Sequence, residues 1–328
     1  MRAMPRRAAT MLAIGLLALT ACAGDEDPDD AAAPEVDETG LHVSPAGFDL
    51  HVGEGQRLLT GVATMDQGLL AFGEIQIELG PIGEDPELVE LPQSTTATFL
   101  PVPGDEPEGD AAAPRVLEGE PGSGVYEAVV DLDEPGNWAM RVVAELEDGT
   151  TREGTAAFQV GEEAQVPAPG DEAPRTQNLT VDDVDGSEVL PVMVDSRAQD
   201  EDADVPDPHI HDSTIAEAID AGRPVVALFS TPTYCLSRFC GPITEVFADL
   251  AEQYGEVADF VHVEVWRDFD AQELNDAAAE WIQTAEGGNE PWAFLVDADG
   301  LIVERWDNVL DPDALVELLE QLPAEADA

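Results

Sequence analysis

The sequence contains no lysine, and positive charge of any kind is scarce in it. The 13 basic residues are all arginines, against 71 aspartates and glutamates, which gives a formal net charge of −58. Nucleic acids and anionic lipid headgroups are themselves negatively charged, so a surface this acidic repels them. The composition therefore excludes nucleic acid as a partner and indicates a protein whose charge keeps it soluble in a salty environment.

A long apolar run is also lacking. The best candidate, residues 11–19, is too short to cross a bilayer, and three arginines precede it within the first seven positions, as in a secretory signal. It ends in Leu-Thr-Ala-Cys at Cys22, which matches the bacterial lipobox pattern. We therefore expect residues 1–22 to be a lipoprotein signal peptide. Lipidated Cys22 would hold the chain on the extracytoplasmic face of the cell membrane by its lipid anchor only.

Cysteine is the third scarcity, because only three are present. Setting Cys22 aside leaves Cys235 and Cys240 in an oxidising compartment, where an isolated pair is expected to be a disulfide at least part of the time. Four residues separate the two. Such a short loop can close into a disulfide if the backbone brings the Cα atoms within roughly 7 Å.

The N-terminal half divides into a tether and a β-rich region. Residues 23–39 have almost no bulky apolar side chains, so we expect a disordered acidic tether. Across residues 40–161 apolar residues alternate with polar ones, most regularly over residues 138–146, and Asp148-Gly149 then supplies a hairpin turn. Several short alternating strands predict an all-β sandwich with a weak resemblance to immunoglobulin-like domains. This region offers no catalytic residues.

The C-terminal part combines helical and strand patterns. Residues 162–204 return to proline, glycine and acidic residues, which predicts a linker with possible extra strands. From there residues 205–328 are expected to form a second domain. Its central feature is residues 225–229, five consecutive apolar positions that suit a strand buried on both faces. The other expected elements are a helix capped by Thr214, a helix at 242–254, a strand at 258–265, a helix at 272–283, a hairpin at 292–306 and a helix after Asp311.

The stretch after the central strand carries the most specific motif. Tyr234 stands before Cys235, and Cys240 is followed by Gly241 and Pro242, which suits the first position of a helix. This stretch resembles the thioredoxin superfamily, in which a buried strand and an aromatic residue precede Cys-Gly-Pro-Cys and a helix. It is most similar to a group of actinobacterial secreted thioredoxin-like lipoproteins with a Cys-x4-Cys-Gly-Pro form.

The resemblance implies an α/β thioredoxin-like C-terminal domain over roughly residues 205–325. It implies that Cys240 pairs with Cys235, because Ile243 occupies the place of the usual second cysteine. Either cysteine could be the nucleophile. It also implies that Pro291, which precedes a hairpin strand, forms a cis peptide bond against the disulfide. Tyr234, Cys235, Cys240 and Pro291 are therefore the candidate catalytic residues, and no cofactor or metal site is expected.

Two departures from the family pattern bear on the thiol chemistry. Leu228 stands where thioredoxins carry a buried acidic residue, so that proton acceptor is missing. Glu290, next to Pro291, would place a carboxylate near the sulfurs and oppose thiolate formation, although Arg238 in the loop would offset it. We expect a cysteine whose pKa is less depressed than in an efficient thioredoxin, so a measured thiol pKa below about 6 would contradict this.

These patterns predict a membrane-anchored thiol-disulfide oxidoreductase that acts on protein thiols or disulfides with an unidentified membrane electron partner. The alternative is a non-catalytic surface lipoprotein with a structural disulfide, whose β-sandwich mediates binding. A copper chaperone would need a histidine downstream of the cysteines, and His262, the last histidine, is predicted on a strand. A peroxidase would need a different spacing from Pro232 to a cysteine. His209 and His211 are a possible metal pair, but with Asp207 and Asp212 beside them they are interpreted as the exposed entry to the first helix.

Overall fold

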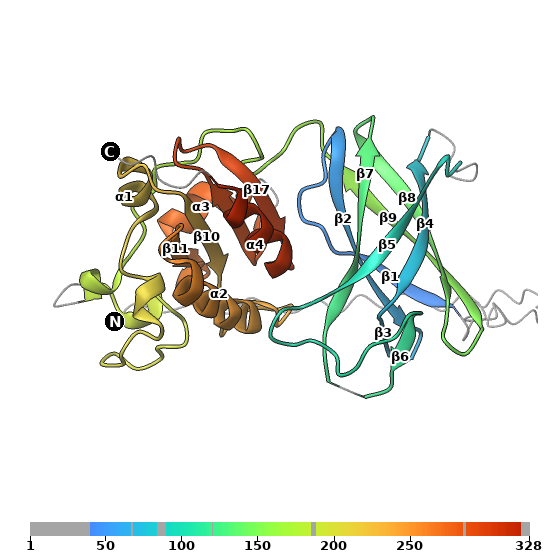
Figure 1. Ribbon diagram of the computed structural model, residues 1–328, viewed down its shortest axis with the longest axis horizontal. Helices are drawn as coiled ribbons and strands as arrows, with labels where there is room; N and C mark the ends of the chain where they lie inside the picture. Colours follow the sequence, from blue (N-terminus) through green and yellow to red (C-terminus); the bar gives the residue numbers. More distant parts are fainter. Residues whose placement is uncertain are drawn as a thin grey trace, which may run out of the picture. The chain divides into compact units, whose positions relative to one another are not determined.

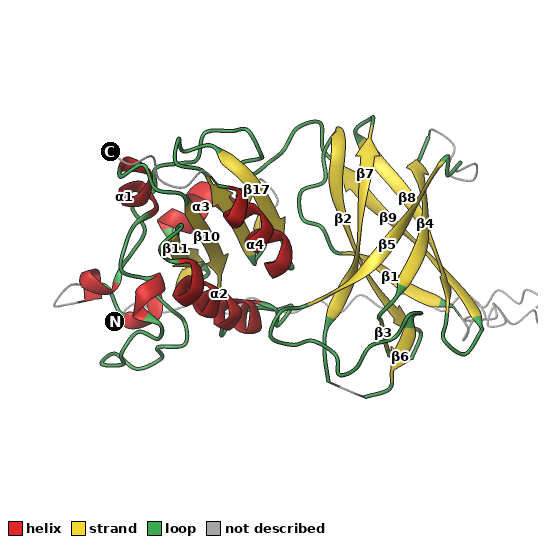
Figure 2. Cartoon of the chain, viewed as in Figure 1, coloured by secondary structure: helices red, strands yellow, loops and turns green. Residues whose placement is uncertain are grey.

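The computed structural model describes residues 40–66, 68–83, 90–119, 121–184, 188–284 and 287–322 (Figures 1 and 2). All of them belong to one compact unit. The predicted signal peptide, Cys22 and the tether to residue 39 lie outside the described residues, and the division into domains at residues 161 and 205 stays a prediction. None of the helices in the described ranges is both long enough and apolar enough to span a membrane.

The described strands between residues 41 and 160 form one large antiparallel sheet. Strand β1 joins it through β2, and the remaining order is β6-β3-β2-β7-β5-β4-β8-β9. Its strands, as far as the chain is described, are β1 (Leu41–Pro45), β2 (Gly53–Thr64), β3 (Leu69–Ala71), β4 (Glu74–Pro81), β5 (Gln93–Pro101), β6 (Arg115–Leu117), β7 (Gly124–Leu132), β8 (Gly136–Glu145) and β9 (Thr151–Val160).

The alternation predicted for this region is present. Along β8, the side chains of Trp138, Met140, Val142 and Ala144 are buried while those between them are not. The hairpin predicted at Asp148-Gly149 joins β8 to β9, with Gly149 at a φ of 81° that suits glycine. The prediction of an immunoglobulin-like sandwich was wrong, however. Such a sandwich has two separate sheets, whereas here each strand is hydrogen-bonded into the same sheet.

The C-terminal residues build a smaller mixed sheet with short helices. Strands β10 (Val225–Ser230) and β11 (Asp259–Glu264) are parallel, and β16 (Trp292–Val296) and β17 (Ile302–Asp307) extend the sheet in antiparallel pairs. The α-helices of the described chain are α1 (Ile215–Asp220), α2 (Cys240–Tyr254), α3 (Asp276–Ile282) and α4 (Pro312–Gln321). The short remaining elements are β12 (Trp266–Asp268), β13 (Glu273–Leu274), β14 (Gln283–Thr284), β15 (Gly287–Gly288), and the 3-10 helices η1 (Val181–Val184), η2 (Pro191–Met193) and η3 (Pro208–Ile210).

Two apolar clusters cover this smaller sheet. Helices α2 and α4 share one of them with β10, and Phe247, Leu315 and Val226 are among its members. The other cluster combines α1 and α3 with residues from irregular chain, including Val166 and Ala173. Between residues 162 and 204 the described chain contains 3-10 turns and one isolated bridge, from Glu172 to Leu301, rather than the extra strands considered from sequence.

The predicted fold class is wrong. Strands account for 39% of the described residues and helices for 18%, with the large antiparallel sheet as the dominant feature, so the described chain is mostly β and shows no thioredoxin-like α/β pattern. The physical reason lies partly in α3. The apolar spacing over residues 272–283 predicted three helical turns, but only Asp276–Ile282 is helical, because its two ends are extended in β13 and β14. Irregular segments do part of the covering that helices would otherwise provide.

Polar contacts connect the two sheets. Arg57 on β2 forms an ion pair with Glu127 on β7 at 2.6 Å, and its guanidinium also reaches Asp307 at the end of β17 and the carbonyl oxygen of Val309 at 2.9 Å. Arg305 pairs with buried Asp49 at 2.8 Å. Arginine is suited to such sites because its planar fork can donate several hydrogen bonds at once.

Candidate functional site: the Cys235–Cys240 disulfide

The two cysteines form a disulfide, as expected. Their Cα atoms are 6.0 Å apart, within the range that a disulfide requires. Cys235 lies five residues after the end of β10, and the loop from 231 to 239 returns the chain so that Cys240 becomes the first residue of α2. The buried run of β10 and the helical pattern after Pro242, both read from the sequence, are what fix this geometry.

The two sulfur-bearing residues differ in their access to solvent. Cys240 is fully buried, whereas Cys235 is partly exposed. The tip of the loop between them is open, and the side chain of Leu236 is 95% exposed. An incoming thiolate can therefore approach Cys235 but not Cys240.

Several groups surround the sulfurs. The hydroxyl of Ser237 lies 3.2 Å from Sγ of Cys235. The first turn of α2 has no side-chain cap on its amide groups, and Cys240 sits on that turn. Helix N-termini favour a thiolate over a thiol because their amides and macrodipole carry partial positive charge. Arg238, in the same loop, is exposed and has a φ of 66°.

An aromatic groove of about 780 Å³ adjoins the loop. Tyr234 stacks on Phe269 with ring centroids 4.3 Å apart, and its hydroxyl lies 3.2 Å from the amide nitrogen of Gln199. Phe239 and Trp266 continue the apolar lining. The groove is thus next to the partly exposed cysteine and has the chemistry to receive an apolar segment of another molecule.

Glu290 and Pro291 lie at the same end of the sheet. The peptide bond between them is cis, as expected. In the antiparallel pairing of β16 with β10, Trp292 lies opposite Phe229. Pro291 therefore lies beside the end of β10, where the cysteine loop begins. Glu290 lines the groove, and burial raises the pKa of its carboxyl. Whether Pro291 and Tyr234 take part in catalysis stays a prediction.

Sequence reasoning missed a buried carboxyl near this site. Leu228 is apolar, as noted, but Glu264 on the neighbouring strand is paired in register with Ser230 at the end of β10. Its carboxylate accepts hydrogen bonds from the backbone amides of Ser196, at 2.8 Å, and Trp266, at 3.2 Å. Burial raises the pKa of Glu264 to about 7. A glutamate at the end of an apolar strand gave no signal in the sequence that its carboxyl is buried near the disulfide.

A second buried polar group was also missed. Asp195 and His211 meet His262, which lies on β11, and all three side chains are fully buried. The expectation that His211 is exposed was wrong, whereas His209 is exposed. Burial lowers the pKa of His262 to about 3. Although burial opposes it, hydrogen bonds from His211 and Arg197 hold the pKa of Asp195 well below its usual range.

Comparisons with known proteins leave the chain without an assigned family. No protein-family profile and no curated protein matches the sequence. Among solved structures, a conjugative transposon lipoprotein from Bacteroides eggerthii is similar over 38% of this chain and 98% of its own, with 14% identity and a TM-score of 0.17. A fragment of Escherichia coli alpha-2-macroglobulin is similar over 44% of this chain and 22% of its own, with 12% identity and a TM-score of 0.17. Likenesses at this level carry no argument about fold or function.

Proposed function

We propose that this protein is a thiol-disulfide oxidoreductase that exchanges Cys235–Cys240 with protein thiols. The observation that carries the proposal is the asymmetry of the disulfide: one sulfur is accessible beside an aromatic groove, and the other is buried on the first turn of a helix. Exchange needs an attackable sulfur and a leaving thiolate that is stabilised. Similarity of the Cys-Gly-Pro motif to the thioredoxin superfamily adds support, independently of the fold.

The reaction begins when a client thiolate attacks Sγ of Cys235. A mixed disulfide forms between the client and Cys235 as the Cys235–Cys240 bond breaks, and Cys240 leaves as a thiolate at the start of α2. A second client thiolate then attacks the client sulfur of the mixed disulfide. The client leaves as a disulfide, Cys235 leaves as a thiolate, and two electrons have passed to the protein. A membrane electron partner would reoxidise the pair, and the same steps in reverse would reduce a client.

The aromatic groove supplies the client site in this proposal. Tyr234, Phe239 and Phe269 offer flat apolar surfaces next to the attacked sulfur. Such surfaces favour an extended apolar segment around the client cysteine over a small hydrophilic thiol. Lipidation at Cys22 would place the site on the extracytoplasmic face, and loss of acyl labelling in Cys22→Ser tests that part separately.

The deciding measurement is the redox potential of the pair. The full-length chain carrying Cys22→Ser is equilibrated with glutathione mixtures, and the oxidised fraction is read by mass spectrometry. We expect a potential between about −270 and −120 mV, the range of exchanging proteins. A value below about −300 mV would instead identify a structural disulfide and favour the non-catalytic surface lipoprotein.

The roles of the two cysteines are tested with a matched pair of variants. Cys240→Ser leaves the accessible thiol of Cys235 without its partner, so it should accumulate a mixed disulfide with an oxidised peptide client. Cys235→Ser leaves only the buried Cys240 thiol and should trap little. Equal trapping by both variants would contradict the assignment of Cys235 as the cysteine that forms the mixed disulfide with the client.

A further inference from the structure

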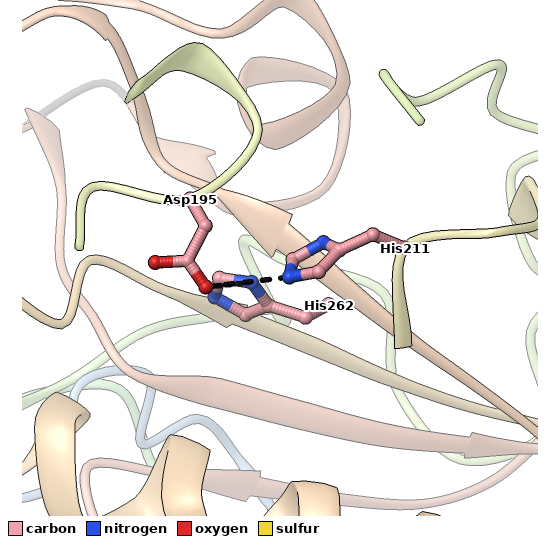
Figure 3. A group of neighbouring side chains, drawn as sticks. All are labelled: Asp195, His211 and His262. Carbon is pink, nitrogen blue, oxygen red and sulfur yellow. Dashed lines mark hydrogen bonds and ion pairs between the residues drawn. The ribbon is translucent and has the colours of Figure 1, made fainter. Parts of the chain in front are cut away.

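Three buried side chains converge on one point beside β11. Asp195 follows η2, His211 follows η3, and His262 lies in the middle of β11 (Figure 3). The distance from Oδ2 of Asp195 to Nε2 of His211 is 3.3 Å, and to Nδ1 of His262 it is 4.0 Å. One ligand atom from each residue lies within 4.8 Å of those from the other two, and none of the three side chains is exposed.

The hydrogen-bond directions around His262 determine which ring nitrogen carries the proton. Thr244 donates its single hydroxyl proton to the carbonyl oxygen of Cys240, at 2.7 Å. Ser230 must therefore donate its own proton in its 2.7 Å contact with Thr244. With that proton used, the 2.8 Å contact between Ser230 and Nε2 of His262 requires the ring to donate. His262 is thus protonated on Nε2.

This assignment leaves a lone pair on Nδ1 of His262. Among the described residues that atom has no hydrogen-bond partner, although it is fully buried. Its neighbour in the cluster is the carboxylate oxygen of Asp195, which is also rich in electrons. That oxygen already accepts from Arg197 at 2.6 Å and lies 3.3 Å from Nε2 of His211, whereas the lone pair on Nδ1 of His262 has no partner in the described chain, and a cation would supply one.

His211 completes the set. Nε2 of its ring points at the same carboxylate oxygen, and its Nδ1 likewise has no partner within the described parts of the chain. Without an ion, Nε2–H donates to this oxygen at 3.3 Å; with that proton on Nδ1 instead, the ring would present a second nitrogen lone pair to the common point. Two imidazoles and one carboxylate form a recognised donor set for transition metals, whereas Ca²⁺ and Mg²⁺ prefer six or more oxygen ligands.

We propose that Asp195, His211 and His262 bind a divalent transition-metal ion of the zinc class, through Oδ2, Nε2 and Nδ1 respectively. Bonds of about 2.1 Å in a tetrahedral site would place donors about 3.4 Å apart. The Asp195–His211 separation of 3.3 Å is close to this value, and the Asp195–His262 separation of 4.0 Å would have to contract by about 0.6 Å. The ligand nitrogens of the two histidines lie within 4.8 Å of each other and would also have to move closer. A water molecule would take the fourth position.

The surrounding residues are arranged as a second shell. Ser230 accepts the Nε2 proton of His262, which fixes both the tautomer and the ring orientation. Arg197 donates to Oδ1 of Asp195 at 3.0 Å and to Oδ2, the proposed ligand atom, at 2.6 Å, and so holds the carboxylate plane. The positive charge of Arg197 opposes the binding of a cation. However, Arg197 also pairs with Asp207 at 2.9 Å, so Arg197, Asp195 and Asp207 together carry one net negative charge.

The ion would have a structural role. Asp195 and His211 belong to chain that is irregular apart from two short 3-10 turns, while His262 belongs to the regular sheet. Binding would attach these segments to β11 without any part in the thiol chemistry. The sequence predicted no metal site, because no spacing connects residues so far apart along the chain.

Zinc titration tests the proposal on the full-length chain with Cys22→Ser and an intact disulfide, which keeps the cysteines from acting as ligands. The protein is first treated with a chelator and dialysed. Calorimetry is then run in excess Mg²⁺ and Ca²⁺, which saturate the many surface carboxylates. We expect one Zn²⁺ to bind per chain and to raise the melting temperature. Binding of no zinc, or of several weak equivalents only, would overturn the proposal.

Matched histidine variants locate the site. His211→Gln and His262→Gln should each weaken zinc binding more than about 100-fold, since even second-shell changes cost 10- to 100-fold. His209→Gln, two residues from His211 but exposed, should bind zinc as the parent does. Equal affinity in all three would contradict the assignment.

Two further measurements keep the test decisive if a ligand variant does not fold. Co²⁺ bound to the parent chain should give the intense visible absorption of a four-coordinate site, whereas weak six-coordinate absorption would refute the donor set. Ser230→Ala keeps all three ligands and removes the acceptor of the His262 proton. It should lower zinc affinity by about tenfold or more, and unchanged affinity would refute the second-shell assignment.

Discussion

Replacing Arg57 by methionine should destabilise the protein far more than the same change at Arg141. Both arginines lie on strands of the large sheet and each pairs with two carboxylates. The side chain of Arg57 is only 17% exposed, and Asp307 is 11% exposed. Arg141 is 40% exposed, as is Glu78 beside it. Methionine preserves the apolar stem at either position, so the comparison isolates the charged head.

The magnitude follows from what Arg57→Met leaves behind. The guanidinium makes four hydrogen bonds, two to carboxylates and two to backbone carbonyl oxygens of Asp307 and Val309. Without it, two half-buried carboxylates lose their counter-charge. Removing one partner of a buried ion pair costs about 3 to 5 kcal/mol, and partial exposure of Glu127 favours the lower end, about 3 kcal/mol. Exposed pairs such as those of Arg141 contribute about 0 to 1 kcal/mol.

Urea unfolding at about 0.2 M salt gives both free energies of unfolding. Each variant removes one positive charge from a chain of net charge −58, so general repulsion rises equally and cancels in the comparison. The double variant Arg57→Met with Glu127→Gln should recover part of the loss, because one of the unpaired carboxylates is then neutral. If both single variants lose the same stability to within about 0.5 kcal/mol, the argument from burial is wrong.

Three further changes have expected outcomes. Thr214→Ala removes the capping box of α1 and should cost about 1 kcal/mol in urea unfolding, while Thr214→Ser should retain most of it. Replacing Cys235 and Cys240 together by alanine should cost about 2 kcal/mol, the loop-closure entropy of so short a loop, in the same assay. Burial raises the pKa of Glu290 above its ordinary 4.5, so stability from this group is full below that value and is lost as the pH rises through the folded pKa; Glu290→Gln should therefore melt higher than the parent at pH 7 and not at pH 4.

Local features of the fold could be predicted from the sequence because they depend on neighbours along the chain. Thr214 and Glu217 form the expected capping box, and Asp311 caps α4 as its position before Pro312 indicated. The five apolar residues from 225 to 229 are indeed buried on both faces in β10. The disulfide could be predicted for the same reason. Only four residues separate the two cysteines, and so short a loop can keep their Cα atoms close enough to be bridged.

The assembly of strands into sheets could not be predicted in the same way. Alternation shows which face of a strand is buried, but not whether the strands form two sheets or one. Here β7 pairs with both β2 and β5, which joins what would otherwise have been separate sheets. Similarly, apolar spacing over residues 272–283 fits a helix, but pairing of its ends in β13 and β14 competes with the helical hydrogen bonds and shortens α3.

The buried polar groups were invisible to sequence reasoning for a further reason: their partners are distant along the chain. His262 sits between two valines in a buried strand, a position that signals a satisfied histidine without naming its partner. Ser230 supplies part of the answer, because it ends β10 and bonds both His262 and Thr244. Thr244 extends this series of hydrogen bonds to the carbonyl oxygen of Cys240. Since each hydroxyl has one proton, a cation held on Nδ1 of His262 would fix the direction of every bond up to the disulfide helix.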